Sequence, residues 1–107
     1  MNKLVKIVVY VDVAHADDIR SAMAKAECGK IGNYDSCSFS VRGVGRFRAL
    51  EGANPFIGEI GKIEEVGEER IETICEESKL ANALELIKSA HPYEKPAIDV
   101  YPILNIQ

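Results

Sequence analysis

Residues 3–11 read Lys-Leu-Val-Lys-Ile-Val-Val-Tyr-Val, and this stretch determines how the rest of the chain can fold. Its density of β-branched side chains predicts a buried β-strand. Successive side chains of a strand point to opposite faces of the sheet, and here both faces are apolar. One face carries Val5, Ile7, Val9 and Val11, and the other carries Leu4, Val8 and Tyr10. The strand therefore has to be covered on two sides.

The segments around this strand show helical and strand periodicities in turn. They predict helices over His15–Cys28 and Ser78–Ala90, and strands over Ser36–Val44, Ile63–Cys75 and Ala97–Ile106. Asp12 and Ser78 are suitable residues for helix N-caps, and Gly29 for the end of the first helix.

Two details of the segments before and within the third strand shape the expected sheet. The apolar positions of the third strand change face between Val66 and Ile71, which predicts a β-bulge. Five of the eight glycines lie between Gly43 and Gly61, which predicts a long structured loop before that strand.

The element order is β-α-β-β-α-β, and the predicted fold class is α+β. Right-handed crossovers give a ferredoxin-like βαββαβ sandwich with an antiparallel sheet, strand order 4-1-3-2, and two helices on one face. We expect residues 1–107 to form a single domain. Two helices cover only one face of a sheet, so the second apolar face predicts self-association.

Composition excludes several classes of protein. The 107 residues carry a formal net charge of −4, which argues against a nucleic-acid binder with a basic surface. No apolar run approaches the roughly 18 residues of a membrane span, and no secretion signal precedes Asp12. The three cysteines are an odd number without CxxC spacing, which favours a reducing, cytoplasmic location.

The glycine-rich stretch contains arginines but no complete phosphate-binding motif. Phe56 stands where a P-loop needs its first glycine, and Ile63 stands where it needs a hydroxyl. Arg46 and Arg48 could still bind an anion through bidentate contacts. Alternatively, these arginines, with Arg42, pair with the acidic third strand across the sheet.

The segment His91-Pro92-Tyr93-Glu94-Lys95-Pro96 packs an imidazole, a phenol and a carboxylate between two prolines. His91 and Glu94 could hold a divalent metal ion or move a proton, although two ligands are an incomplete set. The other histidine, His15, is expected at the opposite end of the sheet. The alternative is a structural turn whose His91 and Tyr93 hydrogen-bond the backbone.

Nucleophilic catalysis has little support in the sequence. Cys37 and Cys75 are expected on strands with their thiols inward, where they would be inert. Cys28 lies at a helix C-terminus, where the dipole does not lower a thiol pKa. We therefore predict no catalytic residue.

Several motifs together resemble one family, the Nif-three-like (YqfO-type) proteins. The segments that carry the resemblance are Ile31–Tyr34, Gly45–Arg48, Gly52–Gly58, His91–Glu94 and Asp99–Pro102. They are similar to the domain inserted in the middle of these proteins, so we expect a stand-alone version of that domain. The resemblance implies a fold like that of the PII and CutA proteins, which are ferredoxin-like trimers. CutA carries a similar His-Pro-Tyr-Glu turn.

The resemblance and the residues together give an expected function. We expect a non-enzymatic binding or regulatory module, a homotrimer, that senses a small anionic ligand or metal ion or docks a partner protein at subunit clefts. The alternative is a small metal-dependent hydrolase with a site shared between subunits. The expected ligand-binding residues are Arg46, Phe47, Arg48, Asn54, His91, Tyr93 and Glu94, of which His91 and Glu94 are the candidate metal ligands.

Overall fold

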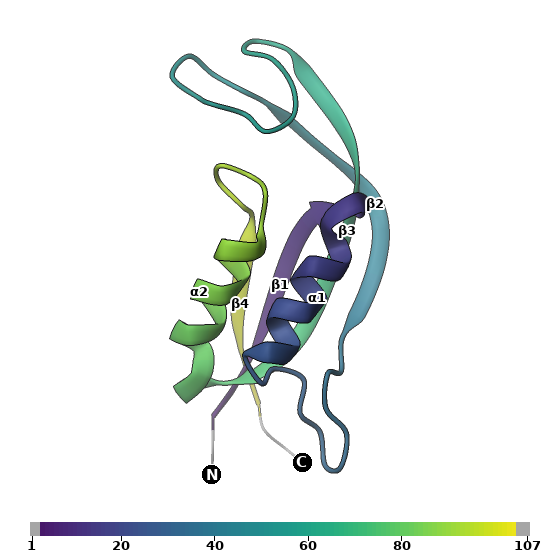
Figure 1. Ribbon diagram of the computed structural model, residues 1–107, viewed down its shortest axis with the longest axis vertical. Coiled ribbons are helices and arrows are strands. Elements are labelled where there is room, and N and C mark those ends of the chain that lie inside the picture. Colours follow the sequence, from purple (N-terminus) through teal and green to yellow (C-terminus); the bar gives the residue numbers. More distant parts are fainter. Residues whose placement is uncertain (1–2, 105–107) are drawn as a thin grey trace.

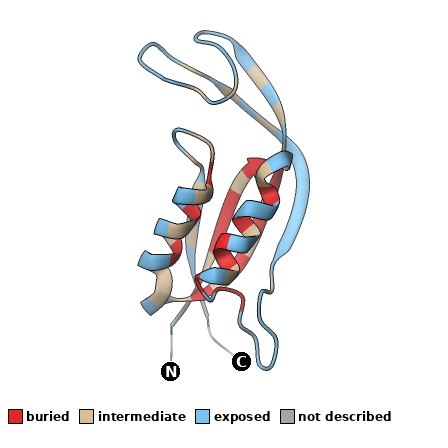
Figure 2. Cartoon of the chain, in the orientation of Figure 1, coloured by how far each residue is buried: buried red, intermediate tan, exposed pale blue. Residues whose placement is uncertain are grey.

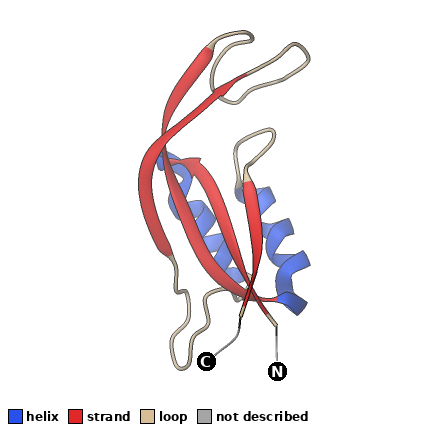
Figure 3. Ribbon diagram, turned by 180° about the vertical axis from the view of Figure 1, so that it is seen from behind, coloured by secondary structure: helices blue, strands red, loops and turns tan. Residues whose placement is uncertain are grey.

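The computed structural model describes residues 3–104, and its fold is the predicted α+β sandwich (Figure 1). The strands are β1 (Leu4–Asp12), β2 (Phe39–Arg48), β3 (Ile63–Glu76) and β4 (Ile98–Ile103), and the helices are α1 (Ala16–Lys25) and α2 (Leu80–Ala90). All strand pairs are antiparallel, in the order β2-β3-β1-β4, which is the predicted order read in reverse. Both helices lie on one face of the sheet (Figures 1 and 3).

The core forms where the odd-numbered face of β1 meets the two helices (Figure 2). Ile7, Val9 and Val11 are fully buried there, since β1 is flanked by β3 and β4 and covered by α1 and α2. The helices contribute Ile19 and Ile87, both also fully buried. A β-branched strand and two amphipathic helices thus supply one continuous apolar layer.

The second face of β1 differs from the expectation. Val8 is completely buried although both helices lie on the other side, and its cross-strand partners are Glu72 of β3 and Asp99 of β4. Lys6 and Arg70 both pair with Glu72, at 3.6 Å and 3.4 Å, and the Arg70 guanidinium lies 6.0 Å from the centre of the Tyr10 ring.

Apolar side chains on this open face are exposed mainly along β2 instead. Phe39 is 65% exposed and Val41 is 49% exposed. Both share the open face with Glu72 and Arg70, their direct partners on β3. Tyr101 of β4 is also 45% exposed on this face, so the uncovered apolar surface lies toward the two edges of the sheet and not over its centre.

The predicted β-bulge in the third strand is wrong. β3 pairs with β1 from Glu68 to Glu76 and with β2 from Ile63 to Glu72, each in one uninterrupted register. The apolar side chains change face because β3 continues past the end of β1 and forms a two-stranded arm with β2 alone (Figure 3). Val66 lies in this arm, so it has no helix to pack against, whereas Ile71 lies over the core.

Other element boundaries also shift from their predicted positions. β2 runs on to Arg48, so the glycine-rich loop covers only 49–62, and Gly43 and Gly45 belong to the strand. α1 ends at Lys25, and positive φ angles at Glu27 and Gly29 turn the chain away from the helix axis. Ser78 lies within a 3₁₀ turn before α2 and makes no cap hydrogen bond. The tail of the predicted last strand, residues 105 and 106, lies outside the described residues.

Candidate functional site

The turn after α2, residues 91–97, is fixed by the His91 ring. Its Nε2 donates a hydrogen bond to the carbonyl oxygen of Tyr10 at 2.8 Å, since a carbonyl only accepts. Its Nδ1 accepts a hydrogen bond from the backbone N–H of Tyr93 at 3.2 Å. The imidazole is therefore buried and fully engaged with backbone groups. For His91 this arrangement agrees with the alternative of a structural turn, in which the ring hydrogen-bonds the backbone.

The Tyr93 hydroxyl is held by a carboxylate from the neighbouring strand. It donates a hydrogen bond to Oε2 of Glu68 at 2.8 Å. Burial, together with this carboxylate, raises the pKa of the Tyr93 phenol well above its usual range. The Glu68 side chain reaches this position by crossing over Gly45 of β2, where any Cβ atom would overlap its carboxyl group. A side chain at position 45 would therefore force the Glu68 carboxylate out of its present position.

The 49–62 loop folds back from the end of the arm toward this turn (Figure 1). The backbone N–H of Asn54 donates to Oε1 of Glu94 at 3.0 Å. The Phe56 ring meets Tyr93 at 6.3 Å between centroids and His15 at 5.6 Å. One hydrogen bond and one aromatic side chain therefore clasp the loop to the body of the domain.

These contacts correct the expected position of His15. α1 begins, and α2 ends, at the same end of the sheet, because each follows one of two antiparallel strands, β1 and β3. His15 therefore lies near the turn and not at the opposite end. Its Nδ1 is 2.7 Å from Oδ2 of Asp12, and its ring packs edge-on against Phe56.

A cavity of about 510 Å³ lies between the arm, the loop and the turn. Its walls are mostly apolar and aromatic, with charged groups among them. The lining residues include Tyr10, Arg46, Phe47, Arg48, Leu50, Phe56, Glu68, Tyr93, Glu94 and Lys95. Cavities of this size and character are typical of sites for small molecules.

Five of the seven predicted ligand-binding residues line this cavity, and the other two support it. Asn54 and His91 hold Glu94 and Tyr93 through the hydrogen bonds above. Sequence reasoning did not single out Tyr10, Phe56, Glu68 or Lys95. Phe56 lies in the glycine-rich stretch and Lys95 in the 91–96 segment, both of which the sequence analysis describes. Tyr10 and Glu68 line the cavity because of the register between the strands, which cannot be recognised from a local motif.

The arginines divide between the two roles that the sequence left open. Arg42 approaches Glu69 at 3.7 Å and Arg46 approaches Glu65 at 3.4 Å, both across the β2–β3 pair. Arg48 forms no ion pair or side-chain hydrogen bond within residues 3–104. Cross-strand pairing therefore accounts for Arg42 and Arg46, whereas Arg48 lines the cavity and is available to bind an anion.

A metal ion at His91 and Glu94 would have to displace existing hydrogen bonds. Both nitrogens of His91 and one oxygen of Glu94 already have partners. Within residues 3–104, no group of three or more His, Cys, Asp or Glu side chains is placed to hold a metal ion. The geometry explains these two residues as structural supports of the turn.

The thiols show no activation. Cys28 and Cys75 are buried, and burial raises the pKa of Cys28 to about 12 and that of Cys75 as well. Cys37 is less buried than expected: it is partly exposed and follows the 31–36 turn ahead of β2. All three cysteines are free.

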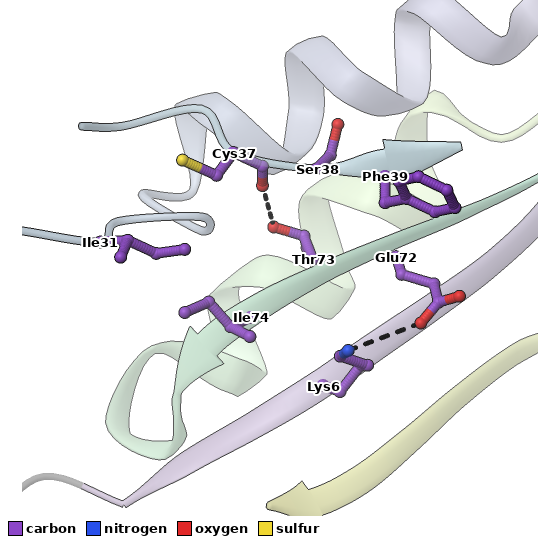
Figure 4. Close-up of a pocket in the computed structure, with 8 residues that line it drawn as sticks. All are labelled: Lys6, Ile31, Cys37, Ser38, Phe39, Glu72, Thr73 and Ile74. Atoms are coloured by element: carbon purple, nitrogen blue, oxygen red, sulfur yellow. Dashed lines mark hydrogen bonds and ion pairs between the residues drawn. The ribbon is translucent and has the colours of Figure 1, made fainter. Parts of the chain in front are cut away.

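A second hollow, of about 330 Å³, lies at the other end of β3 (Figure 4). Lys6 and Glu72 form an ion pair in it, and Thr73 donates a hydrogen bond to the Cys37 carbonyl at 2.8 Å. None of the predicted ligand-binding residues lines this hollow, so it is separate from the candidate site.

The helices of the described part of the chain are short. Within residues 3–104, none has the length and apolar character needed to cross a bilayer.

Comparison with known sequences finds relatives that are longer than this chain. No family model matches it. It is 45% identical, over 95% of its length, to a GTP cyclohydrolase 1 type 2 homolog from Halalkalibacterium halodurans, and 42% identical, over 94%, to the protein of that name from Bacillus subtilis. The chain spans only 27% of the length of each of these relatives.

Solved structures agree in fold. A Bacillus cereus protein related to NIF3 matches 97% of the chain with a TM-score of 0.85 and 42% identity, over 26% of its own length. CutA1 from Pyrococcus horikoshii matches 96% of the chain and 86% of its own, with a TM-score of 0.69 and 19% identity, which shows the fold alone. Over nearly its whole length the chain is therefore similar to one segment of longer Nif-three-like (YqfO-type) proteins, and it has a CutA-like fold.

Proposed function

We propose that this chain is a non-enzymatic binding or regulatory module that takes a small ligand in the cavity beneath the 49–62 loop. The observation that carries the proposal is the construction of this cavity. Its walls come from four separate segments of the chain, and buried or paired groups hold them in place. Ordering these segments costs conformational entropy, which a simple connecting loop does not need to lose. A preorganised cavity loses less entropy when it binds a ligand.

The chemistry of the walls favours binding over catalysis. Both ring nitrogens of His91 are engaged with backbone groups, and the Tyr93 phenol is held protonated by burial beside Glu68. A general acid or base needs a pKa near the working pH and a free path to its substrate. These side chains instead shape and support the cavity. The GTP cyclohydrolase name of the longer relatives is therefore not carried over to this segment.

A thermal-shift panel of nucleotides, aromatic acids and divalent cations tests the proposal. A ligand at a hundred times its Kd raises the free energy of unfolding by about 2.7 kcal/mol. Ala53→Trp would fill the cavity that Ala53 lines, so we expect this variant to lose the shift. Ala81→Trp, on the exposed side of α2, is the matched control.

Two results would contradict the proposal. A shift that survives Ala53→Trp places the ligand elsewhere on the molecule. Turnover of a nucleotide or phosphoester that is lost on replacing His91 supports the hydrolase alternative.

The metal prediction has its own test, a titration of Zn²⁺ into the wild type and His91→Ala. Indistinguishable binding would remove His91 and Glu94 as metal ligands.

We further propose that the chain assembles as a homotrimer through the open face of the sheet. Phe39, Val41 and Tyr101 expose apolar surface there, and the resemblance to PII and CutA supplies the number three. The three free thiols fit a reducing compartment such as the cytoplasm. Sedimentation at micromolar concentration tests the assembly: a monomer would contradict the open-face argument, and a dimer would contradict only the number of subunits.

A further inference from the structure

We infer that the cavity selects a planar aromatic molecule that carries one anionic group, a carboxylate or a phosphate. This inference rests on the proposed binding function and specifies its ligand class. Three features of the cavity carry it: the aromatic walls, the free hydrogen-bond donors at its rim, and its volume.

The aromatic walls favour a flat, apolar ligand body. Phe47 and Tyr93 are half-buried beside the cavity, and Phe56 and Tyr10 add two further rings. The hydroxyl of Tyr93 is already bound to Glu68, so Tyr93 offers its ring and not its polar end. Ring faces and edges bind other planar rings through offset or edge-on contacts.

The rim supplies positive charge with unused donors. Arg48, at the end of β2, and Lys95, in the turn, reach the cavity from separate segments, and neither forms an ion pair or side-chain hydrogen bond within residues 3–104. Both side chains are exposed. A guanidinium can bind a carboxylate or a phosphate with two parallel hydrogen bonds.

The acidic groups of the wall do not cancel this preference. Oε2 of Glu68 accepts a hydrogen bond from Tyr93, and Oε1 of Glu94 accepts one from the Asn54 backbone. One oxygen of each carboxylate is thereby engaged within the protein, whereas the donors of Arg48 and Lys95 remain available to a ligand. The third lining cation, Arg46, is paired with Glu65.

The volume agrees with an organic ligand. About 510 Å³ accommodates a molecule with two fused rings and a substituent, and far exceeds what a bare metal ion needs. A ligand of this kind would contact the loop, the arm and the turn at once.

Isothermal titration with three matched probes tests the inference. The probes are 2-naphthoate, 2-naphthyl phosphate and the uncharged 2-naphthamide. We expect one or both anions to bind at least about threefold more tightly than the amide, the order of magnitude of an exposed charge pair. The two anions distinguish a carboxylate from a phosphate ligand.

Variants locate the two parts of the site. Arg48→Gln and Lys95→Gln should each weaken the anions about threefold and leave the amide unchanged, whereas Phe47→Ala should weaken all three probes. Lys30→Gln, an exposed lysine outside the cavity, is the charge-matched control and should change nothing.

The outcomes separate this inference from the proposed function. Equal binding of amide and anions, or no effect of Arg48→Gln and Lys95→Gln, overturns the charge preference while leaving the cavity as a binding site. If no probe binds, but another ligand gives a thermal shift that Ala53→Trp abolishes, the aromatic ligand class is wrong and the cavity remains a binding site. Probe binding that survives Ala53→Trp overturns both, because the probe then lies outside the cavity.

Discussion

Gly45 controls the position of the Glu68 carboxylate, and through it the Tyr93 hydroxyl. A Cβ at position 45 would overlap the carboxyl group of Glu68, so Gly45→Ala should push this side chain away. Tyr93 then loses its acceptor, and we expect the free energy of unfolding to fall by about 1 kcal/mol. Urea unfolding measures this loss.

The neighbouring Gly43 provides the control for that prediction. It lies on the same strand, and a Cβ atom at this position would have no other atom within 4 Å, so Gly43→Ala should be neutral or slightly stabilising. Combining Gly45→Ala with Tyr93→Phe should cost less than the sum of the two single changes, because both remove one interaction. Full additivity would show that Gly45 does not act through Tyr93.

The buried thiol of Cys28 makes stability depend on alkaline pH. Its pKa is raised from 9.0 to about 12, first by burial and then by the neighbouring Cys75. Between these pH values the unfolded chain loses a proton that the folded chain keeps, so the free energy of unfolding falls as pH rises above 9. Below pH 9 this contribution is constant.

Urea unfolding between about pH 8 and pH 11 measures this dependence. We expect a shallower fall for Cys28→Ala than for the wild type. Cys37→Ala, which removes the partly exposed thiol, is the comparison variant. Identical slopes for all three proteins would contradict the assignment to Cys28.

At the scale of elements, Glu69 of β3 joins α1 to the sheet. Its side chain is 8% exposed, and Arg20 of α1 donates to it at 2.7 Å, with Arg42 of β2 at 3.7 Å. Glu69→Ala would leave Arg20 without its main partner, so we expect a loss of about 2–3 kcal/mol in the free energy of unfolding. Glu65→Ala, whose exposed carboxylate pairs with Arg46, should cost under about 0.5 kcal/mol. Equal losses would contradict this role of Glu69.

The clasp between the 49–62 loop and the turn depends on Glu94. Glu94→Ala removes the acceptor for the Asn54 amide, so we expect hydrogen exchange across the loop to accelerate while the core strands remain protected. Glu51→Ala, an exposed change in the same loop, serves as the comparison. Unchanged exchange at Asn54 in Glu94→Ala would show that the loop is held by other contacts.

The elements also show where prediction from sequence succeeds and fails. The β-branched run in residues 3–11 and the apolar stripes of the helices indicated the order of the elements, and the preference for right-handed crossovers then gave the correct sheet order. The predicted bulge was wrong because the apolar positions of β3 change face where its pairing with β1 ends. The position of that end depends on the tertiary structure and not on the sequence of β3 alone. The predicted position of His15 was wrong although the strand order was right, because the antiparallel pairing of β1 and β3 places the start of α1 and the end of α2 at the same end of the sheet.

At the scale of the whole molecule, the arm formed by β2 and β3 gives the chain an elongated shape of 48 × 24 × 22 Å. The cavity lies where this arm returns to the body, so its walls join residues from 10 to 97. The motifs around Arg46 and His91 indicated two parts of this site. Their meeting, and the contributions of Tyr10 and Glu68, depend on the register of three strands and could not be obtained from local sequence.

The most direct test of the cavity as the binding site is an amide NMR titration of the ¹⁵N-labelled chain with 2-naphthoate. We predict that the chemical-shift changes concentrate at Phe47, Asn54 and Phe56 and in the 93–97 turn. The hollow lined by Ser38, Phe39 and Thr73 (Figure 4) is the reference surface and should show no change. Shifts confined to that hollow, or spread evenly over the open face of the sheet, would contradict the account.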